Sequence, residues 1–242
     1  MAAPHAFITV RLGSSRLPQK CLLEFGQGNV LEHVIRRTRA QGFDPVVCTT
    51  TLSEDDVIAD IARHESASCH RGSVTDKLMR WRGACESFGV TSFHTIDADD
   101  PFLDGDLAKR SMALLESGGY DYVAPSSVSY LASVGYSLRA DVVSRACAIK
   151  TTDDTEMMWY HVDRVPDLRT IELPVPEARI RNVRLTLDYE EDYWLLRTVL
   201  RLLGPEATMA AIEDLFLRNP DLTEINWYRN AAWKAGQEVK RI

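Results

Sequence analysis

The sequence predicts an α/β protein with a mainly parallel, twisted sheet and helices on both faces. Short apolar runs alternate with amphipathic stretches through the first half of the chain, which is typical of parallel strands joined by crossover helices. The length of 242 residues is ordinary for one such domain. Right-handed crossovers place the strand ends, and therefore the expected site, along one edge of the sheet.

The elements of the first half follow in order. Residues 5–11 read as a strand, and residues 28–42 as a helix that Asn29 caps with Glu32 three positions later. Residues 45–51 form the second strand, and residues 53–65 a helix capped by Ser53. The remaining segments are a weak strand near Cys69, a helix over 76–89, a strand over 91–97, a helix over 105–119 and a strand over 120–126.

The pattern loosens after Ser126. Residues 140–150 and 154–163 are predicted as helices, residues 168–174 and 181–188 as strands, and the tail from residue 189 as mostly helical. No internal repeat or linker interrupts the chain. We therefore expect residues 1–242 to form a single domain, with residues 127–176 as a small inserted lobe.

Composition excludes several classes of function. The chain carries 28 Lys and Arg against 35 Asp and Glu, a net charge of −7, which argues against nucleic-acid and anionic-membrane binding. Its five cysteines form no Cys-x-x-Cys pair and read as reduced thiols of a cytoplasmic protein. We expect no signal peptide and no membrane span, because no apolar run approaches about 20 residues.

A basic, glycine-containing loop follows the first strand, with the sequence "RLGSSRLPQK" over residues 11–20. Its small residues are Gly13, Ser14 and Ser15, and its cations are Arg11, Arg16 and Lys20. Small residues let backbone N–H groups approach an anion closely, and the cations supply charge that the acidic chain otherwise lacks. The loop is neither a Walker A nor a Rossmann fingerprint. It predicts a phosphate cradle, with an ordinary solvated loop as the alternative.

Four segments in order resemble the sugar cytidylyltransferases, the family of acylneuraminate, 3-deoxy-manno-octulosonate and spore-coat-polysaccharide-type enzymes, with the last type closest. The opening matches at Arg11, Gly13, Ser14, Arg16, Leu17, Pro18 and Lys20, and further likeness lies in "RGSVTDKLMRW", "TIDADDPFLD" and "VRLTLDYEEDYWLL". The resemblance implies a Rossmann-like nucleotidyltransferase fold of the glycosyltransferase-A-like kind. It also implies transfer of CMP from CTP to an acceptor, release of pyrophosphate, Mg²⁺ as cofactor and a homodimer.

The resemblance also implies roles for individual residues. Nucleotide binding falls to Arg11, Gly13, Ser14, Ser15, Arg16, Lys20, Arg71, Gly72, Ser73 and Asp76. Catalysis falls to Arg16, Lys20, Asp99 and Asp188, of which the two aspartates would hold Mg²⁺. Two simpler interpretations stay open: an acidic turn closed by Pro101 for Asp99, and a capping box with Glu191 for Asp188. Asp97 and Asp100 are interpreted as neighbours, and four aspartates in eight residues would repel one another without a nearby cation.

The acceptor half departs from the family pattern. Glu156 is kept, but Met157 stands where the family has histidine, and "SVGYSLRAD" lacks the usual Pro-x-Gly. A sugar acid is the expected acceptor, with a phosphonate or a phosphorylated polyol as alternatives, and Arg139 and Glu156 as its contacts. Met157, Met158 and Trp159 of the lobe are the expected dimer contact. Two other classes remain: a nucleotide-sugar glycosyltransferase, which the basic loop disfavours, and a regulatory nucleotide-binding module without turnover.

Overall fold

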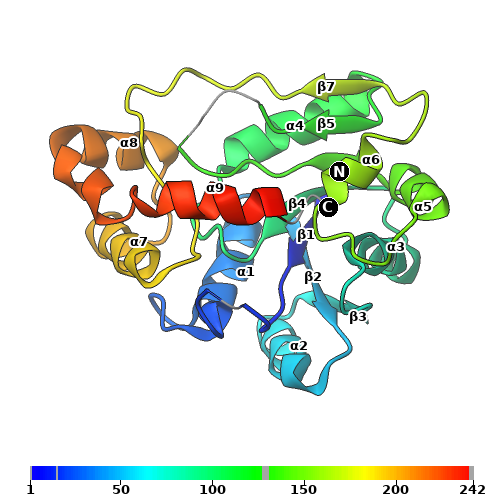
Figure 1. The fold of residues 1–242 in the computed structure, drawn as a ribbon, viewed down its shortest axis with the longest axis horizontal. Helices are drawn as coiled ribbons and strands as arrows, with labels where there is room; N and C mark the ends of the chain where they lie inside the picture. The colour runs from blue at the N-terminus through cyan, green and yellow to red at the C-terminus, as the bar shows by residue number, and fades with distance from the viewer. Residues whose placement is uncertain (1, 15, 127–130, 240–242) are drawn as a thin grey trace.

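A twisted sheet forms the centre of the molecule (Figure 1). The computed structural model describes residues 2–14, 16–126 and 131–239, with side chains up to residue 236; Ser15 of the basic loop and residues 127–130 of the predicted lobe lie outside the described residues. In the described part the sheet has seven strands in the order β3-β2-β1-β4-β6-β5-β7. Their bounds are β1 His5–Thr9, β2 Asp44–Thr50, β3 Ser68–Gly72, β4 Ser92–Asp97, β5 Tyr122–Ala124, β6 Ser137–Arg139 and β7 Thr170–Glu172.

The strand pairing confirms a mainly parallel sheet. β1 pairs in parallel with β2 and with β4, β2 with β3, and β5 with β7. Only β6 among the described strands runs antiparallel to its neighbours, β4 and β5. The order places β1 and β4 side by side at the centre, so the loops that follow these two strands leave the same edge of the sheet.

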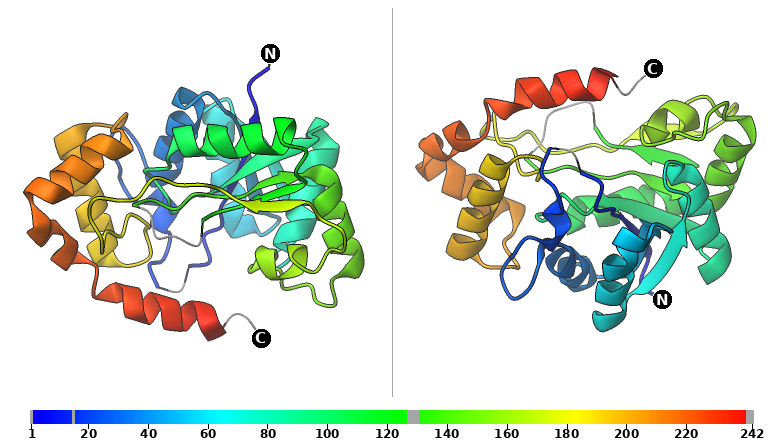
Figure 2. Two further views of the ribbon diagram at one scale, coloured as in Figure 1. Left: turned by 90° about the horizontal axis from the view of Figure 1, so that it is seen from above. Right: turned by 60° about the horizontal axis from the view of Figure 1, so that its bottom comes forward.

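Helices cover both faces of the sheet, as Figures 1 and 2 show. The α-helices are α1 Val30–Ala40, α2 Asp56–His64, α3 Lys77–Phe88, α4 Gly105–Ser117, α5 Ala140–Ile149, α6 Met158–Val162, α7 Glu190–Leu203, α8 Met209–Arg218 and α9 Arg229–Val239, and the 3₁₀ helices are η1 Lys20–Leu22, η2 Ser53–Asp55 and η3 Pro220–Ile225. Alternate residues of β1 divide the core: Ile8 packs with α1, α4 and α7, whereas Phe7 packs with α3, α5 and α6. No helix in the described ranges combines the length and apolarity that a membrane crossing requires.

Two local predictions turn on capping. The α1 cap is confirmed, because the Asn29 side chain accepts from the Glu32 N–H at 2.9 Å and Glu32 accepts from the Asn29 N–H at 2.7 Å. The Ser53 cap is wrong, because Ser53 starts the short helix η2 and α2 begins at Asp56. The buried Asp55 carboxylate instead accepts from the Thr50 hydroxyl and, at 2.9 Å, from the N–H of Leu12. This acid therefore ties the basic loop to the end of β2.

The strand predicted over residues 181–188 is absent from the structure. The segment has no regular secondary structure, and Asn182 has a φ of 64°; one backbone bond joins it to the end of the sheet, from the Leu187 N–H to the Asp99 carbonyl at 2.7 Å. Its polar side chains are occupied in ion pairs, because Arg184 and Asp188 bond one another at 2.9 Å. An alternating pattern predicted a strand here, yet no neighbouring strand lies beside it in the described sheet.

The segment predicted as an inserted lobe, residues 127–176, contributes to the central sheet where it is described. It supplies β6 and β7, together with α5 and α6. Met158 is 2% exposed within the core and so offers little surface to a partner, whereas Met157 lines the cavity described below. A role of this segment in acceptor binding or dimerisation stays a prediction.

Candidate active site

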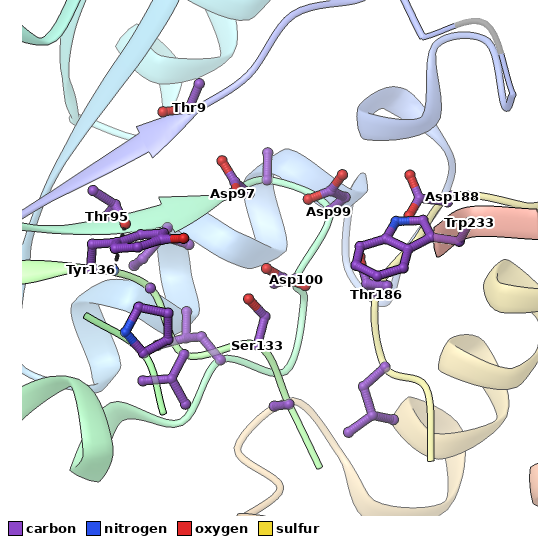
Figure 3. Close-up of a pocket in the computed structure, with 18 of the residues that line it drawn as sticks. Thr9, Thr95, Asp97, Asp99, Asp100, Ser133, Tyr136, Thr186, Asp188 and Trp233 are labelled. Atoms are coloured by element: carbon purple, nitrogen blue, oxygen red, sulfur yellow. Dashed lines mark hydrogen bonds between the residues drawn. The ribbon is translucent and has the colours of Figure 1, made fainter. Parts of the chain in front are cut away.

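A cavity of about 1120 Å³ lies at the carboxyl ends of β1 and β4. Thr9 ends β1 and Asp97 ends β4, and both residues line it, as do side chains from the loops that follow (Figure 3). The sequence placed the site at this edge of the sheet. The acceptor-side segments and α9 complete the wall, and α9 contributes Trp233.

The basic loop borders this cavity. Arg11, Gly13, Ser14, Arg16 and Lys20 all line it. A Cβ atom added at Gly13 would meet nothing within 4 Å, so this position leaves open space where a bulky anion could approach the backbone. The loop backbone is held at one end by the bond to Asp55 and inside by the Ser14 N–H donating to the Leu12 carbonyl at 2.6 Å.

Lys20 connects the loop to two distant carboxylates. Its Nζ donates to Asp99 Oδ2 at 2.5 Å, to Asp188 Oδ1 at 3.1 Å and to the Leu187 carbonyl at 2.8 Å. Burial alone would lower the pKa of Lys20, but the charges of Asp99 and Asp188 raise it above its usual range. The ammonium is therefore charged at neutral pH.

Asp188 is a carboxylate of the cavity wall and does not cap a helix. It is 2% exposed, and its oxygens accept from Arg16 at 2.5 Å, from Arg184 at 2.9 Å and from Lys20. Burial would raise the pKa of Asp188, but Lys20 and Arg16 hold it below its usual value. At the start of α7, Asp192 does the capping, since it accepts from the N–H groups of Asp188 at 2.9 Å and Tyr189 at 3.0 Å. The capping interpretation of Asp188 is wrong.

Asp99 lies in a cluster of acids just after β4. Carboxylate oxygens of Asp97, Asp99 and Asp100 lie within 4.8 Å of one another. Burial raises the pKa of Asp99, and the neighbouring charges of Asp97 and Asp188 add to this despite the opposing effect of Lys20. Burial also raises the pKa of Asp100, again with Asp99 and Asp97 contributing. Such a cluster is stabilised by a cation, and its oxygen donors are the ligands that Mg²⁺ prefers.

The residues predicted from "RGSVTD" lie apart from the cavity wall. The Arg71 guanidinium donates to the carbonyls of Thr50 at 2.9 Å and Leu52 at 2.8 Å and pairs with Asp56 at 2.6 Å. Gly72 packs against the Arg80 side chain. None of Arg71, Gly72, Ser73 and Asp76 is among the described residues that line the cavity. Their part in nucleotide binding stays a prediction.

The Asp76 carboxylate is fully occupied by contacts within the protein. Its carboxylate accepts from the Met79 N–H at 3.0 Å as the cap of α3, from the Thr155 hydroxyl at 2.8 Å, and pairs with Lys150 at 2.6 Å. Ser73 Oγ accepts from the Asp76 N–H at 3.2 Å. These bonds hold the loop before α3 and the segment around Thr155 together.

The two predicted acceptor contacts have different surroundings. Glu156 lines the cavity and pairs with Arg80 at 3.3 Å and Arg11 at 3.6 Å. Arg139 does not line it; its guanidinium donates to the carbonyls of Tyr120 at 3.1 Å and Leu115 at 2.8 Å. The structure brings Glu156 to the site and leaves Arg139 outside.

Several cavity residues escaped the sequence analysis. Arg184 bonds both Asp188 and Asp192 and lies 5.4 Å from the Trp233 ring. Lys77 and Arg80 project from α3, three positions apart, inside the segment that already resembled the family. That spacing places two cations on one helix face, which was the available signal for them. Trp233 carried no such signal, because α9 reaches the cavity only through the tertiary fold.

The chain was compared with known sequences. The model of the family described as cytidylyltransferase matches residues 6–165. The spore coat polysaccharide biosynthesis protein SpsF of Bacillus subtilis is 26% identical over 226 residues, which cover 88% of this chain and 94% of that protein. An uncharacterized protein of Methanocaldococcus jannaschii is 26% identical over 253 residues, covering 96% and 97%.

Solved structures show the same fold. A cytidylyltransferase from Leptospira borgpetersenii superposes with a TM-score of 0.83 at 22% identity, covering 92% of this chain and 97% of that one. A CMP:2-keto-3-deoxy-manno-octonic acid synthetase complexed with CTP superposes with a TM-score of 0.62 at 13% identity, covering 83% and 99%. The fold is therefore that of nucleotidyltransferases. The family model matches about two thirds of this chain, so the chain belongs to the cytidylyltransferase family, the enzymes that transfer a cytidylyl group.

Proposed function

We propose that this protein joins CMP from CTP to a sugar acid or related anionic acceptor, releases pyrophosphate and uses Mg²⁺. The observation that carries the proposal is the meeting of Arg16 and Lys20, from the loop after β1, with Asp99 and Asp188 at one point of the cavity. Cations for a triphosphate and carboxylates for a divalent metal are the two requirements of nucleotidyl transfer.

The chemistry follows from this arrangement. An acceptor oxygen attacks the α-phosphorus of CTP in line, a new P–O bond forms, and the bond to the bridging oxygen of pyrophosphate breaks. Arg11, Arg16 and Lys20 would bind the triphosphate and neutralise the charge that grows on the leaving pyrophosphate. Asp99 and Asp188 would hold Mg²⁺, which supplies Lewis-acid stabilisation of the phosphate oxygens when bound.

A sugar-derived acceptor is supported by one relative and one cavity residue. The relative SpsF is named for spore coat polysaccharide biosynthesis, which supports a sugar-derived acceptor for this chain. Glu156 lines the cavity and would contact an acceptor hydroxyl, whereas Arg139 lies outside the cavity. A phosphonate or a phosphorylated polyol stays an alternative.

The five cysteines are all free thiols, which fits a reducing, cytoplasmic setting.

The test is a pyrophosphate-release assay with CTP, UTP and ATP against sugar acids, phosphonates and phosphorylated polyols, with Mg²⁺ present. We expect release with CTP and one acceptor class only. Equal use of ATP and CTP would contradict the proposal. Glycosyl transfer from a nucleotide-sugar would instead identify a glycosyltransferase, and tight CTP binding without release for every acceptor would identify a regulatory module.

A further inference from the structure

Lys77 is a nearly buried cation that lines the cavity together with two carboxylates, Asp97 and Glu156. It is the first residue of α3, where the helix N-terminus already carries partial positive charge, and it is 8% exposed. Its Nζ pairs with Asp97 at 3.0 Å, but the Asp97 side chain is 51% exposed and so is a solvated partner. The ammonium also lies 5.3 Å from the Trp81 ring centre. Burial would lower the pKa of Lys77, but the charges of Asp97 and Glu156 together raise it above its usual value, so the ammonium stays charged beside the cavity.

The structure holds Lys77 firmly in this place. The Trp81 indole N–H donates to the Thr9 hydroxyl at 3.0 Å, which joins α3, one turn after Lys77, to the end of β1. Asp76, immediately before Lys77, caps the helix and bonds Thr155. The Lys77 side chain lines the cavity. The start of α3 is therefore anchored beside the cavity, and the salt bridge to Asp97 holds the Lys77 ammonium there.

Lys77 and Lys20 border the same acidic cluster from two different elements. Lys20 contacts Asp99 at 2.5 Å from the loop after β1, and Lys77 contacts Asp97 at 3.0 Å from α3. Oxygens of these two aspartates lie within 4.8 Å of one another, and Figure 3 shows both acids at the cavity below Thr9. A group bound against these carboxylates would have an ammonium on each flank.

We propose that Lys77 contacts the α-phosphoryl oxygens of CTP, while Asp97 holds the ammonium in place before the nucleotide binds. This inference rests on the proposed function, in which the loop of Arg16 and Lys20 binds the triphosphate and Asp99 would hold Mg²⁺ against the phosphate oxygens. The α-phosphoryl group gains negative charge in the transition state, and a fixed cation on its second flank stabilises that charge.

The test measures binding by isothermal titration calorimetry with Mg²⁺ and no acceptor, using CTP, CMP and pyrophosphate as separate probes. Only CTP and CMP carry the α-phosphoryl group. We expect Lys77→Ala to weaken both by about 10- to 100-fold, as for the loss of one charged hydrogen bond, and to change pyrophosphate binding less than about twofold. Lys77→Arg should restore most of the affinity. The control, Lys109→Ala, removes an exposed lysine paired with Asp106 and should change none of the three.

The outcomes separate this inference from the proposed function. Unchanged CTP and CMP binding in Lys77→Ala would overturn the inference alone, as would an equal loss for pyrophosphate, which a merely structural role would produce. A wild-type chain that binds no CTP would overturn both proposals. If Lys77→Ala does not fold, Lys77→Met keeps the aliphatic stem against Trp81 and removes the charge, and the same split between CMP and pyrophosphate is expected.

Discussion

Asp188→Asn is the sharpest perturbation of the site, because it removes one charge and almost no volume. The Asp188 carboxylate is 2% exposed and contacts three cations, Arg16, Arg184 and Lys20. After the change Arg184 retains Asp192 and Lys20 retains Asp99, while Arg16 loses the carboxylate it pairs with. The variant therefore leaves Arg16 without its carboxylate partner and removes one of the two carboxylates that contact each of Arg184 and Lys20.

The expected cost to folding is substantial. Removing one partner of a buried ion pair costs about 3 kcal/mol, toward the low end here because the Arg16 side chain is 27% exposed. In a chain of this length each kcal/mol lowers the melting temperature by about 2–4 °C, so we expect a drop of about 6–12 °C. A simple exchange of one helix cap for another would leave it nearly unchanged.

The expected cost to catalysis is separate from the cost to folding. If Asp188 holds Mg²⁺, the asparagine variant should lose at least about 100-fold in the rate of pyrophosphate release, or about 2.7 kcal/mol. The assay is run well below the melting temperature, with the folded fraction measured by circular dichroism. Asp99→Asn should lose a similar factor, because the two carboxylates contact the same ammonium.

Asp192→Asn is the matched control. Asp192 is fully buried and pairs with Arg184 at 3.0 Å, but it does not line the cavity. Its asparagine variant should lose stability and keep the rate per folded molecule within a few-fold. An Asp188→Asn enzyme that is fully active at saturating Mg²⁺, or an Asp192→Asn enzyme that is equally inactive when folded, would refute the reasoning.

Four further predictions concern the loop cations, the metal, a buried histidine and the oligomeric state. Arg16→Ala and Lys20→Ala should each lower the rate by about 100-fold, as for removal of one preorganised donor; full activity in both would disprove the loop assignment. Chelation of Mg²⁺ by EDTA should abolish pyrophosphate release and added Mg²⁺ should restore it, while activity that persists in EDTA would contradict a metal site. Burial lowers the pKa of His33 to about 4, against 6.5 in the unfolded chain, so protons bind first to the unfolded state. The free energy of unfolding in urea should then fall as the pH drops from about 6.5 to about 4, and a flat profile would argue against this. Light scattering should show the homodimer that the family resemblance implies, whereas a monomer near 27.3 kDa would reject it.

Local sequence chemistry determined much of the fold and part of the site. Alternating apolar and amphipathic segments predicted the parallel α/β class, because burial on both sheet faces requires that rhythm. The Asn29 capping box was readable because both partners lie within one turn. The basic loop was readable for a similar reason: Gly13, Arg16 and Lys20 lie within eight positions, after an apolar strand.

The tertiary structure alone decided which distant groups meet. Asp188 reaches Lys20 across 168 positions, and no periodicity encodes that contact. The same holds for Lys77, which pairs with Asp97, 20 positions away, only because the fold brings α3 beside the end of β4. Arg139 looked equally suitable in sequence, but β6 directs its guanidinium to the carbonyls of Tyr120 and Leu115. Composition and spacing report which chemical groups are present, whereas burial and long-range packing decide which of them share a cavity, since that depends on how the whole sheet closes.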